Sequence, residues 1–205
     1  MKFIDFKEQL KIFPVFSLSE IKKIDSNFHR RRLNEWQEKG YIKKLIRGYY
    51  IFSDLEINEN VLFEIANRIY TPSYISFEIA LSYFSLIPES IYRITSASTR
   101  KTTNFSTPIV EFSYKTLKPT LFFGYNLVEY SQRIFKIACP EKALLDYFYL
   151  NPQIKSKDDF ESLRINSELF SEQVNENKFL FLAKKFDQKR LINTVNSFWE
   201  FMNHA

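Results

Sequence analysis

Cysteine, histidine and glycine are scarce in this 205-residue sequence, and each shortage excludes a class of chemistry. With one cysteine, Cys139, and two histidines, His29 and His204, the chain cannot build zinc sites from four cysteines or from two cysteines and two histidines. The lone cysteine also excludes an internal disulfide, which is typical of a reducing compartment. The three glycines are too far apart in the sequence to form a glycine-rich phosphate-binding loop.

Long apolar runs are missing as well. No run of about 18 apolar residues occurs, the length that a membrane helix needs. The first residues, MKFIDFKE, interleave charges where a signal peptide would need an apolar stretch. The sequence therefore predicts a cytoplasmic protein without a membrane segment, and nothing in it indicates a cofactor or a metal.

Positive charge is concentrated at one end of the chain. Residues 1–52 contain twelve Lys or Arg and six Asp or Glu, whereas the remainder contains 17 and 18. All of the excess positive charge thus lies in the first quarter of the sequence. This asymmetry is typical of a small nucleic-acid-binding module joined to a neutral domain, although a basic face in contact with solvent alone would give the same balance.

The first quarter also has the pattern of a winged helix-turn-helix. Apolar residues at 3, 6, 10 and 13 predict a first helix, and Ser17 with Glu20 forms a capping-box pattern for a second. A third helix is predicted from residue 26 to residue 39, where Gly40 ends it. Residues 41–52 then predict two short strands with a bend at Gly48. We predict a DNA-binding domain over residues 1–55, with its third helix in the major groove and its hairpin along the backbone.

Two sets of polar residues in this domain are candidates for DNA contact. At 100° per residue, Phe28, His29, Leu33 and Trp36 gather on the packing side of the third helix. Arginine suits guanine and asparagine suits adenine, so the opposite side is predicted to read bases. That base-reading side consists of Asn27, Arg30, Arg31 and Asn34. The cations predicted to contact phosphates are Lys22, Lys23, Lys43, Lys44 and Arg47.

The remaining residues, 56–205, predict an α+β domain with a helical C-terminal tail. Helices are expected at about 60–69, after a cap at Ser76, and from Pro140 onward. Between them, β-branched and aromatic runs at 91–95, 108–112, 121–123 and 134–138 predict a small, mainly antiparallel sheet. An apolar stripe over residues 187–203 is typical of core packing or of a self-association face. The hydroxyl-rich run at 95–103 is either a solvated loop or strand end, or a polar surface for phosphate or RNA.

No plausible set of catalytic groups is present, so the sequence does not predict an enzyme. His29 is expected to pack inside the first domain. Glu141 and Asp146 are five residues apart, about 140° around a helix, and so cannot form a local carboxylate pair.

A series of short motifs resembles the AbiEi antitoxins of type IV toxin-antitoxin systems. The motifs are KGYI at 39–42, RGYY at 47–50, SYIS at 73–76, ALSY at 80–83, ITS at 94–96, RKT at 100–102 and ACPEKALLD at 138–146. The resemblance covers roughly residues 5–150, and it is the order and spacing of the motifs together that carry it.

The resemblance implies a bacterial autorepressor that binds inverted repeats in its own promoter, which requires two copies of the chain and is compatible with a homodimer on DNA. It also implies an antitoxin that counters a nucleotidyltransferase-like toxin without forming a stable complex with it. Arg100 and Lys101 are candidates for the antitoxin surface. The alternative is a protein-binding module that neutralises a toxin by direct contact, with the stripe at 187–203 as its docking surface.

Overall fold

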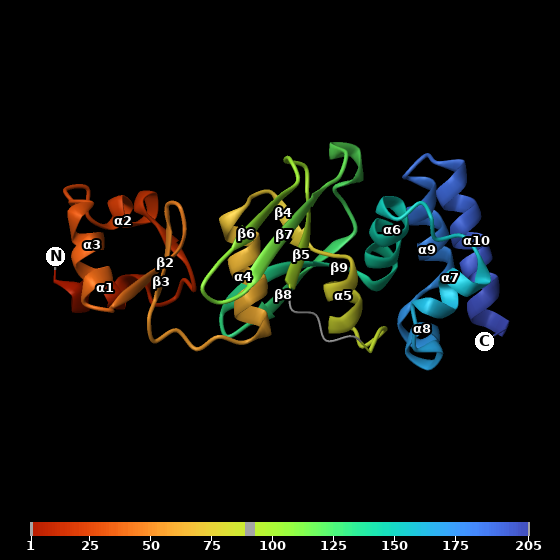
Figure 1. Ribbon diagram of the computed structural model, residues 1–205, viewed down its shortest axis with the longest axis horizontal. Helices are drawn as coiled ribbons and strands as arrows, with labels where there is room; N and C mark the ends of the chain where they lie inside the picture. The colour runs from red at the N-terminus through yellow and green to blue at the C-terminus, as the bar shows by residue number, and fades with distance from the viewer. Residues whose placement is uncertain (1, 89–92, 205) are drawn as a thin grey trace.

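The computed structural model describes residues 2–88 and 93–204, which form an α+β protein. Figure 1 shows an elongated molecule in which three parts follow one another along the long axis: a small N-terminal unit, a central sheet with its covering helices, and a group of C-terminal helices. We call residues 2–55 the N-terminal unit and residues 56–204 the C-terminal region. Buried apolar side chains form one cluster within the N-terminal unit and a larger one that extends through the C-terminal region.

In the N-terminal unit, three short helices pack with a three-stranded antiparallel sheet. The helices are α1 (Phe3–Leu10), α2 (Leu18–Ile24) and α3 (Arg31–Glu38), and the strands are β1 (Phe16–Ser17), β2 (Ile42–Ile46) and β3 (Tyr49–Phe52). The strand order is β1-β3-β2. The sequence predicted the β2–β3 hairpin but not β1, because a strand of two residues has no periodicity to detect.

Local signals define the ends of these elements. The predicted capping box at α2 is confirmed, since the Glu20 N–H donates to Ser17 Oγ at 3.4 Å and the Ser17 N–H donates to Glu20 Oε2 at 2.7 Å. Gly40 (φ 70°) follows α3, and Gly48 (φ 89°) lies in the turn of the hairpin. Both values are in the left-handed region, where a residue without a Cβ is favoured.

Aromatic side chains make up much of the core of the N-terminal unit. The ring of Phe6 is fully buried and lies 4.5 Å from the ring of Trp36, 5.4 Å from Phe16 and 5.8 Å from Phe52, centre to centre. Each such side chain contributes about 1.5–3 kcal/mol when it is removed from water. Large rings therefore let a unit of this size bury enough apolar surface to hold its helices together.

The third helix begins later than predicted. It starts at Arg31, and residues 26–30 are not helical: 26, 27 and 30 lie in turns, and 28 and 29 have no regular structure. The Asp25 carboxylate accepts a hydrogen bond from the Asn27 N–H at 3.1 Å, which offers the backbone an alternative to a helical turn. As a result His29 precedes the helix and is exposed, so the prediction that it packs inside the unit is wrong.

A six-stranded mixed sheet forms the centre of the C-terminal region, with the order β6-β7-β5-β4-β9-β8. The β4–β9 and β5–β7 pairs are parallel and the other pairs are antiparallel. Its strands are β4 (Ser73–Ile75), β5 (Arg93–Ser98), β6 (Thr103–Ser106), β7 (Glu111–Thr116), β8 (Tyr125–Tyr130) and β9 (Arg133–Ala138). The sheet is therefore larger and more mixed than the small, mainly antiparallel one predicted.

Several local predictions for this region need correction. Strands β4, β6 and β8 were not predicted. The run at 121–123 is not a strand, because Leu121 is the last residue of a 3₁₀ turn, Pro119–Leu121, and residues 122 and 123 have no regular structure. Residues 91 and 92 of the first predicted strand lie outside the described residues. Ser76 does not cap a helix, because its hydroxyl bonds to Asp146 and the next helix starts at Glu78. The run at 95–103 is divided: residues 95–98 belong to β5, an interior strand in which Ser96 and Ser98 are buried, whereas residues 99–102 form the connection to β6, of which 100–102 are exposed.

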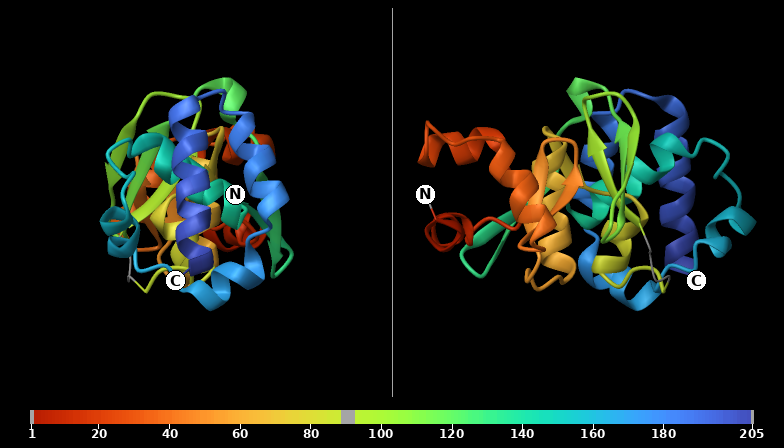
Figure 2. Two further views of the ribbon diagram at one scale, coloured as in Figure 1. Left: turned by 90° about the vertical axis from the view of Figure 1, so that its right-hand side faces the viewer. Right: turned by 60° about the vertical axis from the view of Figure 1, so that its left-hand side comes forward.

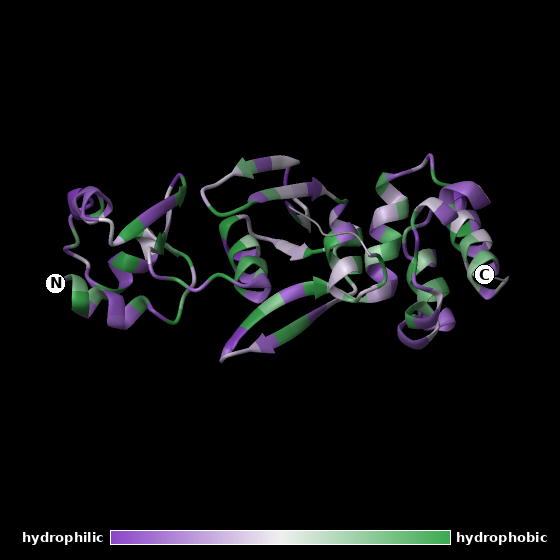
Figure 3. Ribbon diagram, turned by 60° about the horizontal axis from the view of Figure 1, so that its bottom comes forward, coloured by the Kyte–Doolittle hydropathy of each residue, from purple (hydrophilic) through white to green (hydrophobic). Residues whose placement is uncertain are grey.

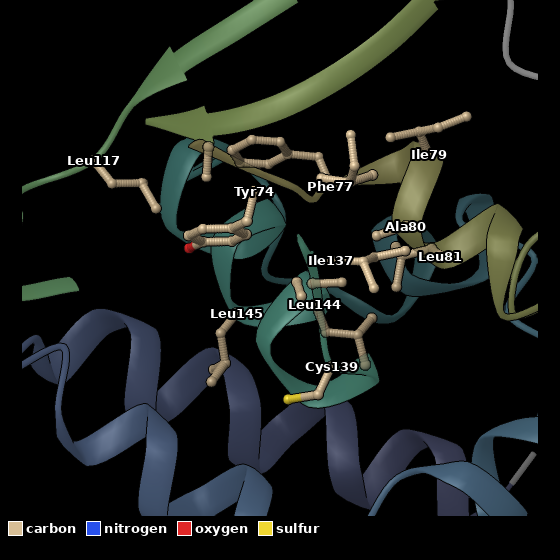
Figure 4. Packing of buried hydrophobic residues seen from close by; sticks show 14 of the residues in the cluster. Tyr74, Phe77, Ile79, Ala80, Leu81, Leu117, Ile137, Cys139, Leu144 and Leu145 are labelled. Atoms are coloured by element: carbon tan, nitrogen blue, oxygen red, sulfur yellow. The ribbon is translucent and has the colours of Figure 1, made fainter. Parts of the chain in front are cut away.

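Helices cover both faces of this sheet (Figure 1). Helix α4 (Glu59–Ile69) packs on the face toward the N-terminal unit, while α5 (Glu78–Tyr83) and α6 (Pro140–Leu150) lie on the other face. The predicted helix start at Pro140 is confirmed. Side chains of β4, α5 and α6 pack together on that other face, as Tyr74, Leu81 and Leu144 show in Figure 4.

The last four helices pack on the outer side of α6. They are α7 (Lys157–Ser162), α8 (Ser167–Gln173), α9 (Glu176–Lys184) and α10 (Lys189–His204). Helices α9 and α10 lie side by side there, as the left panel of Figure 2 shows. The stripe at 187–203 is confirmed as core packing: Leu191, Val195, Phe198 and Met202 are all buried against the other helices.

The hairpin of the N-terminal unit packs on two sides. Ile42 and Phe52 point into the unit's own core, whereas Leu45 and Ile51 belong to the larger core of the C-terminal region. An ion pair between Glu20 and Arg68 of α4 also joins the two parts, and the Arg68 guanidinium lies 4.5 Å from the ring centre of Phe13. The N-terminal unit is thus attached through its hairpin and through Glu20 of α2.

Candidate nucleic-acid interface

All of the side chains predicted to contact DNA are exposed in the structure. Three elements and their connecting turns carry them: the last turn of α2, the segment from residue 27 to the first turns of α3, and the β2–β3 hairpin. The exposed set is Lys22, Lys23, Asn27, Arg30, Arg31, Asn34, Lys43, Lys44 and Arg47.

The structure divides the predicted base-reading side of α3. Arg31 and Asn34 lie within the helix three residues apart and therefore share a face. Asn27 lies in the preceding turn, and Arg30 is the N-cap residue. The prediction that these four residues form one helical face is wrong, because the helix starts after Arg30.

The charge on the exposed face of α3 changes from positive to negative along the helix. Arg31, Asn34, Glu35 and Glu38 follow the spacing of a single helical face, and all four are exposed. Arg31 Nε lies 3.9 Å from Glu35 Oε1, and the Arg31 side chain is 89% exposed. Carboxylates repel phosphates, so only the N-terminal half of this helix is suited to a nucleic-acid duplex.

A groove of about 340 Å³ forms where the start of α2, the start of α3 and the turn of the hairpin meet. Its lining includes Arg30 and Arg47, together with Leu18, Gly48 and Tyr50. Within residues 2–88 and 93–204, no hydrogen bond or ion pair joins either guanidinium to another group. Two unpaired guanidinium groups at one groove favour an anion with several oxygens, such as a phosphodiester, because each can donate two parallel hydrogen bonds to it.

The adjacent lysines of the hairpin, Lys43 and Lys44, lie on opposite faces of it. In β2, Lys43 lies opposite Ile51 and Lys44 opposite Tyr50 in the pairing with β3. Successive side chains of a strand point to opposite faces, so Lys44 lies on the side of the Arg30 and Arg47 groove, which Tyr50 lines. Lys43 lies on the side of Ile51, toward the C-terminal region, and is further from that groove.

The two candidate antitoxin residues lie in the turn between β5 and β6, and both are exposed. The Arg100 guanidinium lies 4.0 Å from the ring centre of Tyr70 and donates to the Thr71 carbonyl oxygen at 3.3 Å. Tyr70 Oη in turn donates to the Lys101 carbonyl oxygen at 2.7 Å. Arg100 therefore helps to hold this turn against α4, whereas the side chain of Lys101 extends into solvent.

A buried polar cluster was missed by sequence reasoning. Tyr74 Oη and Ser76 Oγ each donate to Asp146 Oδ2 at 2.8 Å, and Lys142 forms an ion pair with the same carboxylate and donates to Tyr74 Oη at 2.8 Å. Burial raises the pKa of the Asp146 carboxyl and lowers the pKa of the Lys142 ammonium, while their ion pair opposes both shifts.

This cluster is enclosed by the protein. The Lys142 Nζ atom lies 5.0 Å from the ring centres of both Phe123 and Phe186, and Lys142 and Asp146 are fully buried. The signal in the sequence was a lysine and an aspartate four residues apart within an apolar helix. As expected, Glu141 does not join Asp146, because it points toward Lys178 of α9, 2.8 Å away.

None of the helices in the described segments combines the length with the apolar character of a membrane span. Among the same residues, no group of three or more His, Cys, Asp or Glu side chains is arranged to hold a metal ion. Comparison with known protein families and with curated proteins gives no match for the chain.

Proposed function

We propose that this protein is a sequence-specific DNA-binding regulator that represses its own promoter, with residues 1–55 as a winged helix-turn-helix. Three helices followed by an antiparallel hairpin have the order of elements that such a module requires. The observation that carries the proposal is the groove lined by Arg30 and Arg47, beside the N-terminal end of α3. It combines an exposed helix end with two guanidinium groups that lack a partner within the described chain.

In this proposal the N-terminal half of α3 enters the major groove. Arg31 and Asn34 contact base edges, because they share one exposed face and have the donors and acceptors to read guanine and adenine. Arg30 and Arg47 bind a backbone phosphate, a different role for Arg30 from the base reading predicted from the helical wheel. Lys44, Lys22 and Lys23 contact neighbouring phosphates and position the helix without reading sequence.

The same proposal includes an antitoxin role against a nucleotidyltransferase-like toxin, without a stable complex. Its support is the ordered set of motifs that resembles AbiEi antitoxins, together with the exposed side chain of Lys101 between two strands. The alternative, neutralisation by direct contact through the stripe at 187–203, is less well supported, because Leu191, Val195, Phe198 and Met202 are buried within the chain and Ile192 and Trp199 are half-buried.

A salt-dependent binding titration on the protein's own upstream DNA and on a shuffled control tests the DNA-binding role. We expect tight binding to the upstream fragment alone, with a steep dependence on salt. Arg31→Ala should cost about 1–3 kcal/mol on the upstream fragment and little on the control. Arg47→Ala should weaken both complexes and lower the salt slope by about 1.

Lys118→Ala is a matched control, because Lys118 is an exposed cation outside the N-terminal unit and its loss should change neither DNA complex. Equal, weak binding to both DNAs would contradict the proposed regulator. Equal losses for Arg31→Ala on both fragments would contradict base reading by that residue alone.

Co-expression with the product of the neighbouring gene tests the antitoxin role. We expect the chain to restore growth without co-purifying with that product, and Lys101→Glu to reduce the rescue. A stoichiometric complex would favour direct neutralisation instead.

A further inference from the structure

The two edges of the six-stranded sheet differ in how well they are protected. Strand β6 has four residues and is followed directly by Thr107 and Pro108. Short strands and nearby prolines are common ways to prevent an edge from pairing with another chain. Strand β8 has six residues, Tyr125–Tyr130, without a proline or a lysine, and its pairing with β9 runs without a bulge.

The outer side of β8 is open. Figure 3 shows the β8–β9 hairpin at the lower margin of the molecule, with no other element along the outer side of β8. Among the residues that the structure describes, no backbone hydrogen bond joins β8 to any element except β9 and its own connection. The strand therefore presents unpaired backbone donors and acceptors to solvent.

One face of this hairpin also exposes apolar side chains. Leu127 is 61% exposed and Ile134 is 49% exposed, and in the described part of the six-stranded sheet they are the large apolar residues that face solvent to this extent. Leu127 lies opposite Lys136, two residues from Ile134, so the two apolar side chains are diagonal neighbours on one face. The other face is covered, since Phe135 packs on Phe63 of α4 with ring centres 5.4 Å apart.

We propose that β8 pairs antiparallel with β8 of a second copy of this chain, which joins the two six-stranded sheets into one. A twofold axis perpendicular to the sheet keeps each face continuous, and it must pass through the position of one residue because side chains alternate with a period of two. An axis at Leu127 places Leu127 opposite itself and Tyr125 opposite Glu129. An axis at Val128 places Leu127 opposite Glu129, an apolar side chain against a carboxylate.

The axis at Leu127 is thus the register that the side chains favour. It pairs Tyr125–Glu129 of both copies, buries the exposed leucine against its counterpart and leaves no two like charges directly opposite. We infer a second copy as the partner because, in this register, the exposed edge of β8 is complementary to itself: Leu127 meets Leu127, and Tyr125 meets Glu129. The proposal goes beyond DNA binding and does not depend on it.

Cysteine cross-linking in a Cys139→Ser background tests both the dimer and its register. Cys139 is the sole native cysteine and is buried, so this background leaves an introduced thiol as the reactive one. We expect Leu127→Cys to form a disulfide-linked dimer under mild oxidation, because the two thiols face each other across the axis. Val128→Cys is the matched control and should not cross-link, because each Val128 then lies opposite Asn126 of the second copy.

Sedimentation of the chain without DNA provides a second measurement. We expect a dimer that Leu127→Lys weakens at least about tenfold in Kd, because two like charges would then meet at the axis. Ile57→Lys replaces an exposed apolar residue away from β8 and should leave the dimer intact. Circular dichroism establishes that each variant is folded.

A chain that sediments as a monomer up to its solubility limit would overturn the proposal, as would a dimer that Leu127→Lys leaves unchanged. Cross-linking of Val128→Cys but not of Leu127→Cys would overturn the register. Failure of the DNA titration with a dimer intact would contradict the proposed function alone.

Discussion

The two parts of the molecule use charged side chains in opposite ways. In the N-terminal unit, the cations predicted to contact DNA are exposed, and Arg30 and Arg47 form no hydrogen bond or ion pair with the described residues. In the C-terminal region, Lys142 and Asp146 are fully buried and paired with each other. Arg30 and Arg47 are therefore accessible to a ligand, whereas Lys142 and Asp146 are enclosed by the fold.

This difference explains why net charge alone is a poor guide to function. The C-terminal region has nearly balanced charge, but two of its ionic groups, Lys142 and Asp146, lie inside the core and pair with each other. The N-terminal unit has an excess of six positive charges within residues 1–52, and its own core is almost entirely apolar. The placement of charged side chains, more than their number, distinguishes an exposed charged surface from a structural ion pair.

The largest effect expected is a loss of folding stability when one partner of the buried Lys142–Asp146 ion pair is removed. Asp146→Ala leaves the Lys142 ammonium without its counterion in the core and should lower the free energy of unfolding by about 3–5 kcal/mol. Urea denaturation measures this loss. Asp158→Ala, which removes an exposed carboxylate from α7, is the control and should change stability by no more than about 0.5 kcal/mol.

A double variant makes the same test sharper. Lys142→Met with Asp146→Leu replaces the ion pair by apolar side chains of similar size, and it should recover most of the stability lost by the single variant. A double variant as unstable as Asp146→Ala would indicate that the bonds from Tyr74 and Ser76 to Asp146, rather than the ion pair, stabilise this part of the core.

The next largest effect expected is a loss of folding stability at alkaline pH, caused by buried tyrosines of the C-terminal region. Burial raises the pKa of Tyr74 and of Tyr114 in the C-terminal region above the ordinary value of about 10. Their phenols stay protonated in the folded chain while those of the unfolded chain ionise. Stability should be intact below about pH 10 and fall above it, by about 1.4 kcal/mol per pH unit for each phenol.

Urea midpoints measured from neutral pH to about pH 11 check this expectation. Tyr114→Phe is the matched variant: it loses the 2.7 Å hydrogen bond to the Ala66 carbonyl oxygen, but it should also make the alkaline decline less steep. A decline of unchanged slope would assign the pH dependence to other groups.

The smallest effect expected is at the junction of the two parts. Arg68→Ala removes the ion pair with Glu20 and the contact with the Phe13 ring, and should cost about 1 kcal/mol because the pair is partly exposed. Thermal unfolding measures the loss. The control is Arg93→Ala, since the Arg93–Glu111 pair is more exposed and lies within one sheet; it should have a smaller effect. Equal losses would mean that the junction pair has no special role.

Local features of the fold were predictable from the sequence because neighbouring residues produce them. The capping box at Ser17, the helix end at Gly40 and the helix start at Pro140 each depend on a few adjacent residues. The start of α3 was not predictable by periodicity, because the Asp25 side chain competes for the backbone at that point. Strand β4 was missed for a related reason, since three buried residues show no alternation.

The candidate interface was predictable only in part. Its residue types and their exposure followed from charge and periodicity. That Arg30 and Arg47 line the same groove did not, because the two residues belong to elements that are separated along the chain. The opposite orientation of Lys43 and Lys44 could have been inferred from strand alternation, whereas their positions relative to the groove could not.

By itself, the sequence determined the capping box at Ser17, the helix start at Pro140, the location of the excess positive charge and the buried stripe of α10, because these properties depend on composition and short-range spacing. The tertiary structure alone decided the strand order, the enclosure of the Lys142–Asp146 pair and the open edge at β8. Each of these depends on contacts between residues far apart in the chain, and such contacts are selected by how the layers pack, which no local pattern encodes.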